Sequence, residues 1–122
     1  MQTKFSHKHN LLIWSFFIIA LVLLAYGLFR PTPPEEVFTH SDKAGHFIAF
    51  FTVSFLGKMA LNAVPSSIYW GTWLILAGLL EYLQDILCPM RVFSLEDAYA
   101  NGIGVCIAII ACYLISKRAP KP

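Results

Sequence analysis

The chain alternates long apolar runs with short polar segments. The first run covers residues 11–29 and contains no charged residue. At about 1.5 Å of rise per residue, a helix of this length matches the roughly 30 Å hydrocarbon core of a bilayer. Three further runs cover residues 44–63, 68–87 and 97–115. The pattern predicts an all-α membrane protein built as a four-transmembrane-helix bundle.

The polar segments predict the aqueous ends and loops of this bundle. They cover residues 1–10, 30–43, 88–96 and 116–122, with a tight turn before residue 68. The prolines at positions 31, 33 and 34 lack the backbone donor that a helix needs, and lipid offers no replacement, so the first helix ends before them. A secretory signal peptide is the competing interpretation of residues 11–29. The run exceeds the apolar core of about 7–15 residues found in such peptides and lacks a small-residue cleavage site, which favours a retained anchor.

The composition agrees with lipid as the main solvent of the chain. Hydrophobic residues make up 57% of the sequence and charged residues 13%, which is too few charges for an ordinary soluble domain. The net charge of +2 is small and dispersed, so no nucleic acid is expected as a partner. Cys88, Cys106 and Cys112 form no CxxC or Cys/His pairing. Neither a disulfide framework nor a zinc site is predicted, and no cofactor is expected.

The basic residues fall unevenly on the two sides of the predicted bundle. With four spans, both termini share one side with the turn that follows the second span. That side holds Lys4, Lys8, Lys58, Lys117, Arg118 and Lys121. The other side holds all seven acidic residues. Because short cytoplasmic loops are enriched in lysine and arginine, both termini are predicted to be cytoplasmic, in a multi-pass protein of the plasma (inner) membrane.

Polar residues gather at the outer ends of the predicted spans, where ionisable groups are costly in lipid and are candidates for function. Asp42 and His46 are four residues apart and so share one helix face. The same spacing rule groups Glu81 with Gln84 on the third span. It also groups Asp97 with Asn101 on the fourth. The candidate ligand-binding residues are Asp42, Lys43, His46, Glu81, Gln84, Arg91, Asp97 and Asn101.

Several of these residues also have structural interpretations. Ser94-x-x-Asp97 has the spacing of a capping box, in which both side chains satisfy backbone donors at a helix start. Asp42 would complement the dipole of its helix. Glu81 and Gln84 would join helices through hydrogen bonds in lipid. These interpretations stay open beside the functional ones.

The ordered set of polar motifs resembles the VanZ-like family. The motifs are Asp42-Lys43-x-x-His46-Phe47, Glu81-x-x-Gln84, Pro89-x-Arg91, Ser94-Leu95-x-Asp97 and Asn101-x-x-Gly104, within residues 41–108. The resemblance implies a small multi-span envelope protein and marks the eight candidate residues as a polar signature. The eponymous member of the family is associated with resistance to the glycopeptide teicoplanin, and the family names no reaction. Ala108 stands where a second glycine is common, a difference that concerns packing.

The leading functional hypothesis is a site for the polar head of an envelope lipid or a lipid-linked glycan precursor. Charges of both signs meet at the predicted outer interface. Arg91 and Lys43 would contact phosphate, since the arginine fork meets phosphate oxygens bidentately and lysine adds a point charge. Asp42, Glu81 and Gln84 would orient these cations or accept sugar hydroxyls.

A membrane-embedded hydrolase or transferase is the second hypothesis. His46 would be the general acid or base, oriented by Asp42. Glu81 or Asp97 would be a further catalytic partner. The chain has no nucleophile-elbow motif and no glycine-rich phosphate loop, which disfavours an enzyme. A divalent metal held by His46, Asp42 and Glu81 would lack a recognised ligand spacing, so no metal is predicted.

A structural or partner-binding subunit is the third hypothesis. Ala100, Gly104 and Ala108 have the small-xxx-small spacing that lets helix backbones approach closely in lipid. This seam predicts that the fourth helix packs against a neighbouring helix. The protein would then join a membrane protein partner or a second copy of itself.

Overall fold

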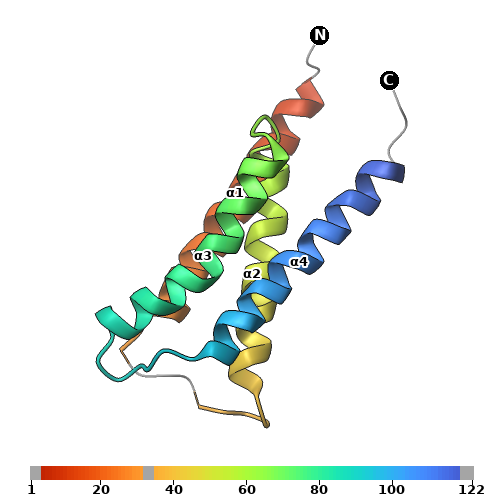
Figure 1. The fold of residues 1–122 in the computed structure, drawn as a ribbon. Coiled ribbons are helices and arrows are strands. Elements are labelled where there is room, and N and C mark those ends of the chain that lie inside the picture. Colours follow the sequence, from red (N-terminus) through yellow and green to blue (C-terminus); the bar gives the residue numbers. More distant parts are fainter. Residues whose placement is uncertain (1–3, 32–34, 119–122) are drawn as a thin grey trace.

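The structure, a computed structural model, describes residues 4–31 and 35–118, and this part of the chain is all-helical. Four helices follow one another: α1 (Lys4–Phe29), α2 (Ser41–Ala60), α3 (Ser66–Leu87) and α4 (Leu95–Arg118) (Figure 1). Each helix overlaps one predicted span. Lys121 of the predicted tail and Pro33 and Pro34 of the predicted outer loop lie outside the described residues.

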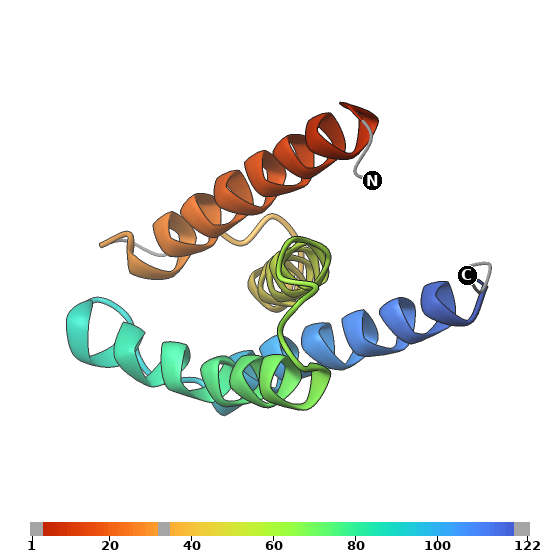
Figure 2. The same ribbon diagram turned by 90° about the horizontal axis from the view of Figure 1, so that it is seen from above.

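α2 lies at the centre of the arrangement, between α1 on one side and α4 on the other (Figure 2). It packs most extensively against α4, and α3 packs mainly against α4 as well. The α1–α2 and α3–α4 connections lie at one end of the bundle, while the α2–α3 turn lies at the other end with the start of α1 (Figure 1). The helix ends that carry the candidate residues therefore meet at one end.

α2 begins at Ser41, three residues before the predicted span, so Asp42 and Lys43 lie in its first turn and not in a loop. The chain enters the helix through His40, whose backbone is left-handed with a φ of 64°. The carboxylate of Glu36 accepts a hydrogen bond from the backbone N–H of His40 at 2.9 Å. This bond holds the chain at the point where it turns into α2.

Two helices of the described residues are long and apolar enough to cross a membrane: α1 over His9–Phe29 and α4 over Leu95–Arg118. α2 and α3 have 20 and 22 residues, but neither contains a stretch apolar enough to meet the same criterion. Both contain ionisable residues away from their ends, such as His46 in α2 and Glu81 in α3. These side chains lower the hydropathy of α2 and α3, so that composition marks α1 and α4 as the membrane-crossing helices of the described residues.

The apolar core lies in the middle of the bundle, around Phe50 of α2 and Val105 of α4, which are both fully buried. Trp73 of α3 packs edge to face on Phe50, with ring centroids 6.1 Å apart. Phe17 and Leu24 close the core from the side of α1. All four helices thus contribute to one core.

Polar side chains are buried between the helices, while many large apolar side chains face outward. Leu23 of α1 is 63% exposed and Ile75 of α3 is 69% exposed. This distribution is the reverse of that in a soluble domain, where charged groups are almost never fully buried. The polar residues buried in the bundle are Ser54, Glu81, Gln84 and Asn101.

The small-residue seam of α4 is confirmed as a packing surface. A Cβ atom at Gly104 would lie 2.5 Å from the carbonyl oxygen of Phe47 and 3.0 Å from the backbone nitrogen of Phe51 on α2. Such an approach requires a residue without a side chain. Ala108, one turn further on, is fully buried. The seam brings the first half of α2 against the first half of α4, and this contact positions the site.

Candidate functional site

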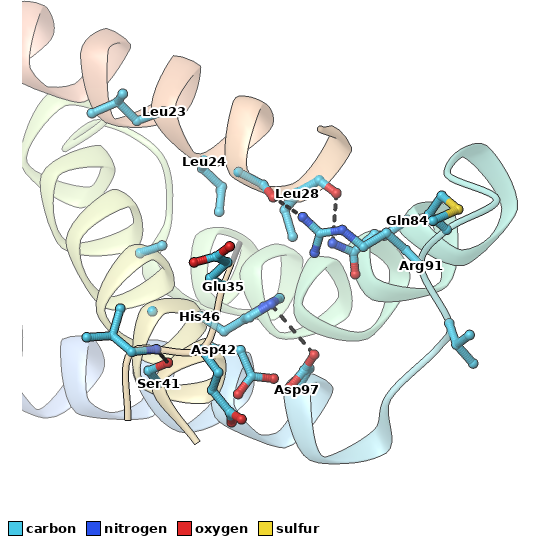
Figure 3. Close-up of a pocket in the computed structure, with 17 residues that line it drawn as sticks. Leu23, Leu24, Leu28, Glu35, Ser41, Asp42, His46, Gln84, Arg91 and Asp97 are labelled. Atoms are coloured by element: carbon cyan, nitrogen blue, oxygen red, sulfur yellow. Dashed lines mark hydrogen bonds and ion pairs between the residues drawn. The ribbon is translucent and has the colours of Figure 1, made fainter. Parts of the chain in front are cut away.

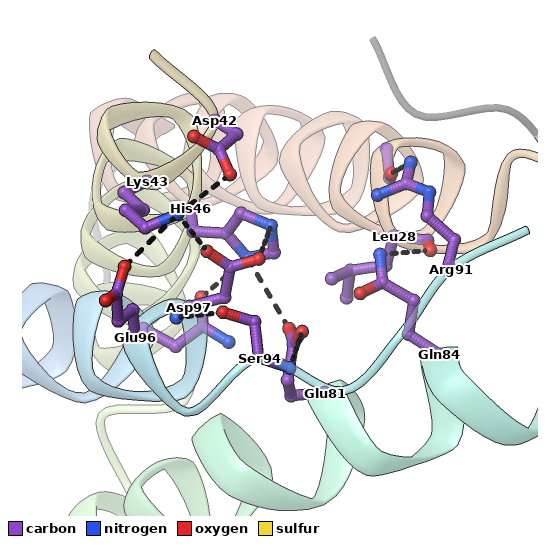
Figure 4. Close-up of polar contacts among 12 residues, drawn as sticks. Leu28, Asp42, Lys43, His46, Glu81, Gln84, Arg91, Ser94, Glu96 and Asp97 are labelled. Carbon is purple, nitrogen blue, oxygen red and sulfur yellow. Dashed lines mark hydrogen bonds and ion pairs between the residues drawn. The ribbon is translucent and has the colours of Figure 1, made fainter. Parts of the chain in front are cut away.

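The candidate residues divide into two groups at the end of the bundle where α2, α3 and α4 meet (Figure 4). Gln84 and Arg91 lie against the end of α1. The other six form one connected group, which we call the polar cluster: Asp42, Lys43, His46, Glu81, Asp97 and Asn101.

His46 is the centre of the polar cluster. Its Nδ1 lies 2.9 Å from Oδ1 of Asn101 and 3.9 Å from Oε2 of Glu81. Its Nε2 lies 3.7 Å from Oδ2 of Asp97. The side chain of Asp42, predicted to orient His46, bonds to Lys43. In the structure Asn101 and Asp97 orient His46 instead, because α4 packs directly against the His46 ring.

Glu81, a candidate of the sequence analysis, is fully buried. Its Oε1 accepts a hydrogen bond from the backbone N–H of Ser94 at 3.3 Å. Its Oε2 has no hydrogen-bond partner within residues 4–31 and 35–118. One oxygen of this carboxylate therefore has a structural role, and the other faces His46.

The capping box predicted at the start of α4 is half present. The hydroxyl oxygen of Ser94 accepts a hydrogen bond from the backbone N–H of Asp97 at 3.2 Å, as predicted. The return bond from the Asp97 carboxylate is absent among the described residues, since Glu81 of α3 occupies the Ser94 N–H. The capping prediction is thus confirmed for Ser94 and wrong for the Asp97 side chain. That carboxylate is left to face His46 and Lys43.

Lys43 is surrounded by carboxylates. Its Nζ lies 3.1 Å from Oδ2 of Asp42, 3.4 Å from Oδ1 of Asp97 and 3.6 Å from Oε2 of Glu96. The hydrogen bond that Lys43 donates to the carboxylate of Asp42 raises the pKa of Lys43, which lies outside the predicted span, above its ordinary value. The lysine is therefore a charged bridge between the starts of α2 and α4.

Gln84 and Arg91 bond to the last turn of α1, where helical carbonyl groups have no partner in their own helix. The side-chain amide of Gln84 donates to the carbonyl oxygen of Leu28 at 2.7 Å. The guanidinium of Arg91 donates to the carbonyl oxygen of Gly27 at 3.0 Å. Such a cation at a helix C-terminus also complements the helix dipole. The two residues therefore cap α1, and the structure does not bring them into the polar cluster.

A cavity of about 650 Å³ lies between the end of α1 and the polar cluster. Leu24 and Leu28 form its α1 side, while His46 and Asp97 lie across from them (Figure 3). Arg91 lines the cavity at the α3–α4 connection. One wall is thus apolar and the facing wall is ionisable, which is the arrangement that an amphiphilic molecule requires.

The α1 wall of the cavity is not among the sequence predictions. Leu24 and Leu28 are four residues apart and so share a helix face, which is buried against the bundle. This spacing is the one feature of the sequence that could have indicated the α1 wall. It cannot single out a face, however, because nearly every position of the run is apolar.

No protein-family model, curated protein or solved structure matches the chain. The likeness to the VanZ-like family therefore stays a proposal carried by the sequence motifs. The function has to be inferred from the polar cluster and the cavity.

Proposed function

We propose that the chain is a multi-pass protein of the plasma (inner) membrane whose outer cavity binds the polar head of an envelope lipid or a lipid-linked glycan precursor. The observation that carries this proposal is the cavity, in which an apolar wall faces ionisable side chains. The headgroup boundary of a lipid joins the same two chemistries. The VanZ-like motifs agree with a role in the envelope, and a link to teicoplanin resistance belongs to the same proposal.

The proposal includes four membrane spans. The shortest helix, α2, has 20 residues, and about 20 helical residues cross the hydrocarbon core. Although α2 and α3 do not stand out as membrane-crossing helices by composition, their buried polar residues Ser54, Glu81 and Gln84 face the bundle and not the lipid. Ionisable residues inside spans are expected to face the bundle interior in this way.

The proposed orientation places the polar cluster outside the cytoplasm. Lys58 lies near the α2–α3 turn, and Lys117 and Arg118 end α4, all at the end of the bundle away from the cavity. The acidic residues lie at the opposite end. Enrichment of cytoplasmic segments in lysine and arginine supports cytoplasmic termini and an outward-facing cavity.

Arg91 is the proposed contact for an anionic headgroup. Its guanidinium caps Gly27, but its Nε is buried with no hydrogen-bond partner among the described residues. An arginine N–H left unpaired beside a cavity is suited to a phosphate oxygen. Lys43 is a weaker candidate than the sequence suggests, because three carboxylates already neutralise it.

Native mass spectrometry of the detergent-purified protein tests the proposal. Wild type is compared with Arg91→Gln and with Arg30→Gln as a matched control, because Arg30 lies at the same end of the bundle but outside the cavity. We expect a specific lipid or lipid-linked glycan mass in wild type and in the control. Its occupancy should fall about tenfold in Arg91→Gln through loss of a charge-assisted bond.

A thermal unfolding scan of each protein separates lost binding from lost folding, since Arg91 also caps α1. Equal adducts in folded wild type and folded Arg91→Gln would exclude the headgroup contact. The absence of any specific adduct in wild type would favour the structural-subunit hypothesis.

A hydrolase or transferase is the second candidate function, supported by the position of His46 beside Asp97 in the cavity wall. In that case the bound lipid would be a substrate, and His46 would exchange a proton with it. His46→Gln should then abolish turnover while lipid adducts persist. Loss of the adducts without any detectable turnover in wild type would argue against an enzyme.

A further inference from the structure

Three side chains with metal-binding chemistry converge from three helices. His46 of α2, Glu81 of α3 and Asp97 of α4 each present one ligand atom, and these atoms lie within 4.8 Å of one another. We propose that they bind one divalent transition-metal ion. The inference goes beyond the headgroup site and does not depend on it, because the three ligands are positioned by the helices themselves.

Asn101 determines which nitrogen of His46 is free to bind the ion. The side-chain amide of Asn101 donates to the carbonyl oxygen of Ala77 at 3.1 Å, so its oxygen faces Nδ1 of His46. An amide oxygen can only accept, so Nδ1 of the neutral ring carries the proton and Nε2 has the lone pair. Metal-bound histidines are held in this way, with the other ring N–H donated to an oxygen.

The free nitrogen faces a carboxylate oxygen at a distance that suits a bridging cation. Nε2 of His46 and Oδ2 of Asp97 are 3.7 Å apart. A direct hydrogen bond would bring them to about 2.7–2.9 Å. Two ligands of a tetrahedral ion with bonds of about 2.0–2.1 Å lie roughly 3.3 Å apart. The two side chains would therefore need to move together by only a few tenths of an ångström to bind one ion, which a small change in side-chain torsion angles allows.

Glu81 provides an independent observation. Its side chain is fully buried, and Oε2 has no hydrogen-bond partner among the described residues. A buried carboxylate oxygen without a partner is costly. This oxygen lies 3.9 Å from Nδ1 of His46, and the ligand atoms of Glu81, His46 and Asp97 all lie within 4.8 Å of one another. A cation there would supply the missing partner.

The charge balance around the three ligands favours a cation. Lys43 is shared among Asp42, Glu96 and Asp97. Within the described part of the chain, Glu81 forms no ion pair with a lysine or arginine. Two acidic side chains therefore face one imidazole, and a divalent ion would neutralise both carboxylates.

The donor set indicates the class of metal. One imidazole nitrogen with two carboxylate oxygens suits Zn²⁺ or Mn²⁺, whereas Ca²⁺ and Mg²⁺ favour oxygen ligands alone. Three protein ligands leave at least one coordination position open. His46 and Asp97 both line the cavity, so the open position would face it.

Isothermal titration calorimetry tests the site. Detergent-purified protein is stripped with EDTA and titrated with Zn²⁺ and, separately, with Mn²⁺. We expect one equivalent of at least one ion to bind to wild type. Glu81→Gln and Asp97→Asn each remove a ligand charge at nearly constant volume and should weaken binding by about tenfold or more. Glu96→Gln is the matched control, since this carboxylate pairs with Lys43 but is not one of the three ligands.

X-ray absorption of the Zn²⁺-loaded or Mn²⁺-loaded wild type requires no variant and so stays informative if a substitution prevents folding. We expect imidazole nitrogen and oxygen in the first coordination shell and no sulfur. A sulfur ligand, binding of equal strength in all four proteins, or the lack of stoichiometric binding would overturn the proposal. If no metal binds, the lipid adduct of wild type should still be observed by native mass spectrometry. If no lipid adduct is observed, metal binding should still be measured by calorimetry.

Discussion

The Glu81 carboxylate of α3 accepts a hydrogen bond from the backbone N–H of Ser94 at 3.3 Å, directly before the first residue of α4. In a capping box, an acidic side chain three residues further along the same helix would accept this N–H. Here the acceptor comes from the neighbouring helix. The arrangement ties α3 to the start of α4 and frees Asp97 for the polar cluster.

We predict that Glu81→Leu loosens the start of α4. The substitution removes the acceptor of the Ser94 N–H, and losing such a bond costs about 1–3 kcal/mol. Hydrogen exchange of residues 94–98 should accelerate by about tenfold or more, since about 1.4 kcal/mol corresponds to a factor of ten. Glu81→Gln keeps an acceptor oxygen and should change exchange less. Unchanged exchange in Glu81→Leu would show that the bond does not hold the start of α4.

A second prediction concerns the contact between α2 and α4. Gly104→Ala places a Cβ atom 2.5 Å from the carbonyl oxygen of Phe47, so the helices must move apart. Overpacking of this kind costs about 1–3 kcal/mol. The matched control is Gly102→Ala, where a Cβ atom meets nothing within 4 Å. The control should be neutral or stabilising by up to about 1 kcal/mol, because alanine favours helix. Equilibrium unfolding in mixed detergent measures both free energies.

The comparison of sequence with structure shows where spacing is informative. The seam at Gly104 could be predicted, because small residues one turn apart have one main use in helices that pack in lipid. The partner of His46 was predicted less well. Spacing within one helix favoured Asp42, whereas the structure pairs His46 with Asp97 and Asn101. Sequence does not encode which helices are neighbours, so contacts between helices cannot be ranked from it.

The roles of Gln84 and Arg91 illustrate a second limit. Both were predicted from their polarity to belong to the site, and both line the cavity, but their described hydrogen bonds go to the backbone carbonyls of Leu28 and Gly27. A carbonyl group occurs at every residue and gives no signal in the sequence. Only the packing of α3 against the end of α1 identifies these acceptors.

The capping of α1 leads to a third prediction. Gln84→Leu removes the donor to Leu28 and leaves a buried carbonyl group unpaired, at a cost of about 1–3 kcal/mol. The amide hydrogens at the end of α1 should then exchange faster with solvent. The protein should also unfold at a lower concentration of denaturing detergent. Cys88→Ala is the comparison, because the Cys88 thiol lies 3.4 Å from the neighbouring carbonyl of Phe29 and a thiol is a weak donor. Equal effects of the two substitutions would contradict this account.

The fourth prediction tests whether α2 crosses the membrane. Val37, which is 87% exposed, precedes α2 at the cavity end, and Asn62 is exposed in the turn that follows it. In a variant without native cysteines, we expect Val37→Cys to react with a membrane-impermeant maleimide in intact cells. Asn62→Cys should react only after permeabilisation, because the proposed orientation, which follows from the lysine at position 58 and the basic termini, has that turn in the cytoplasm. Reaction of both cysteines from outside would mean that α2 does not cross the bilayer, and the reverse pattern would invert the orientation while keeping the span.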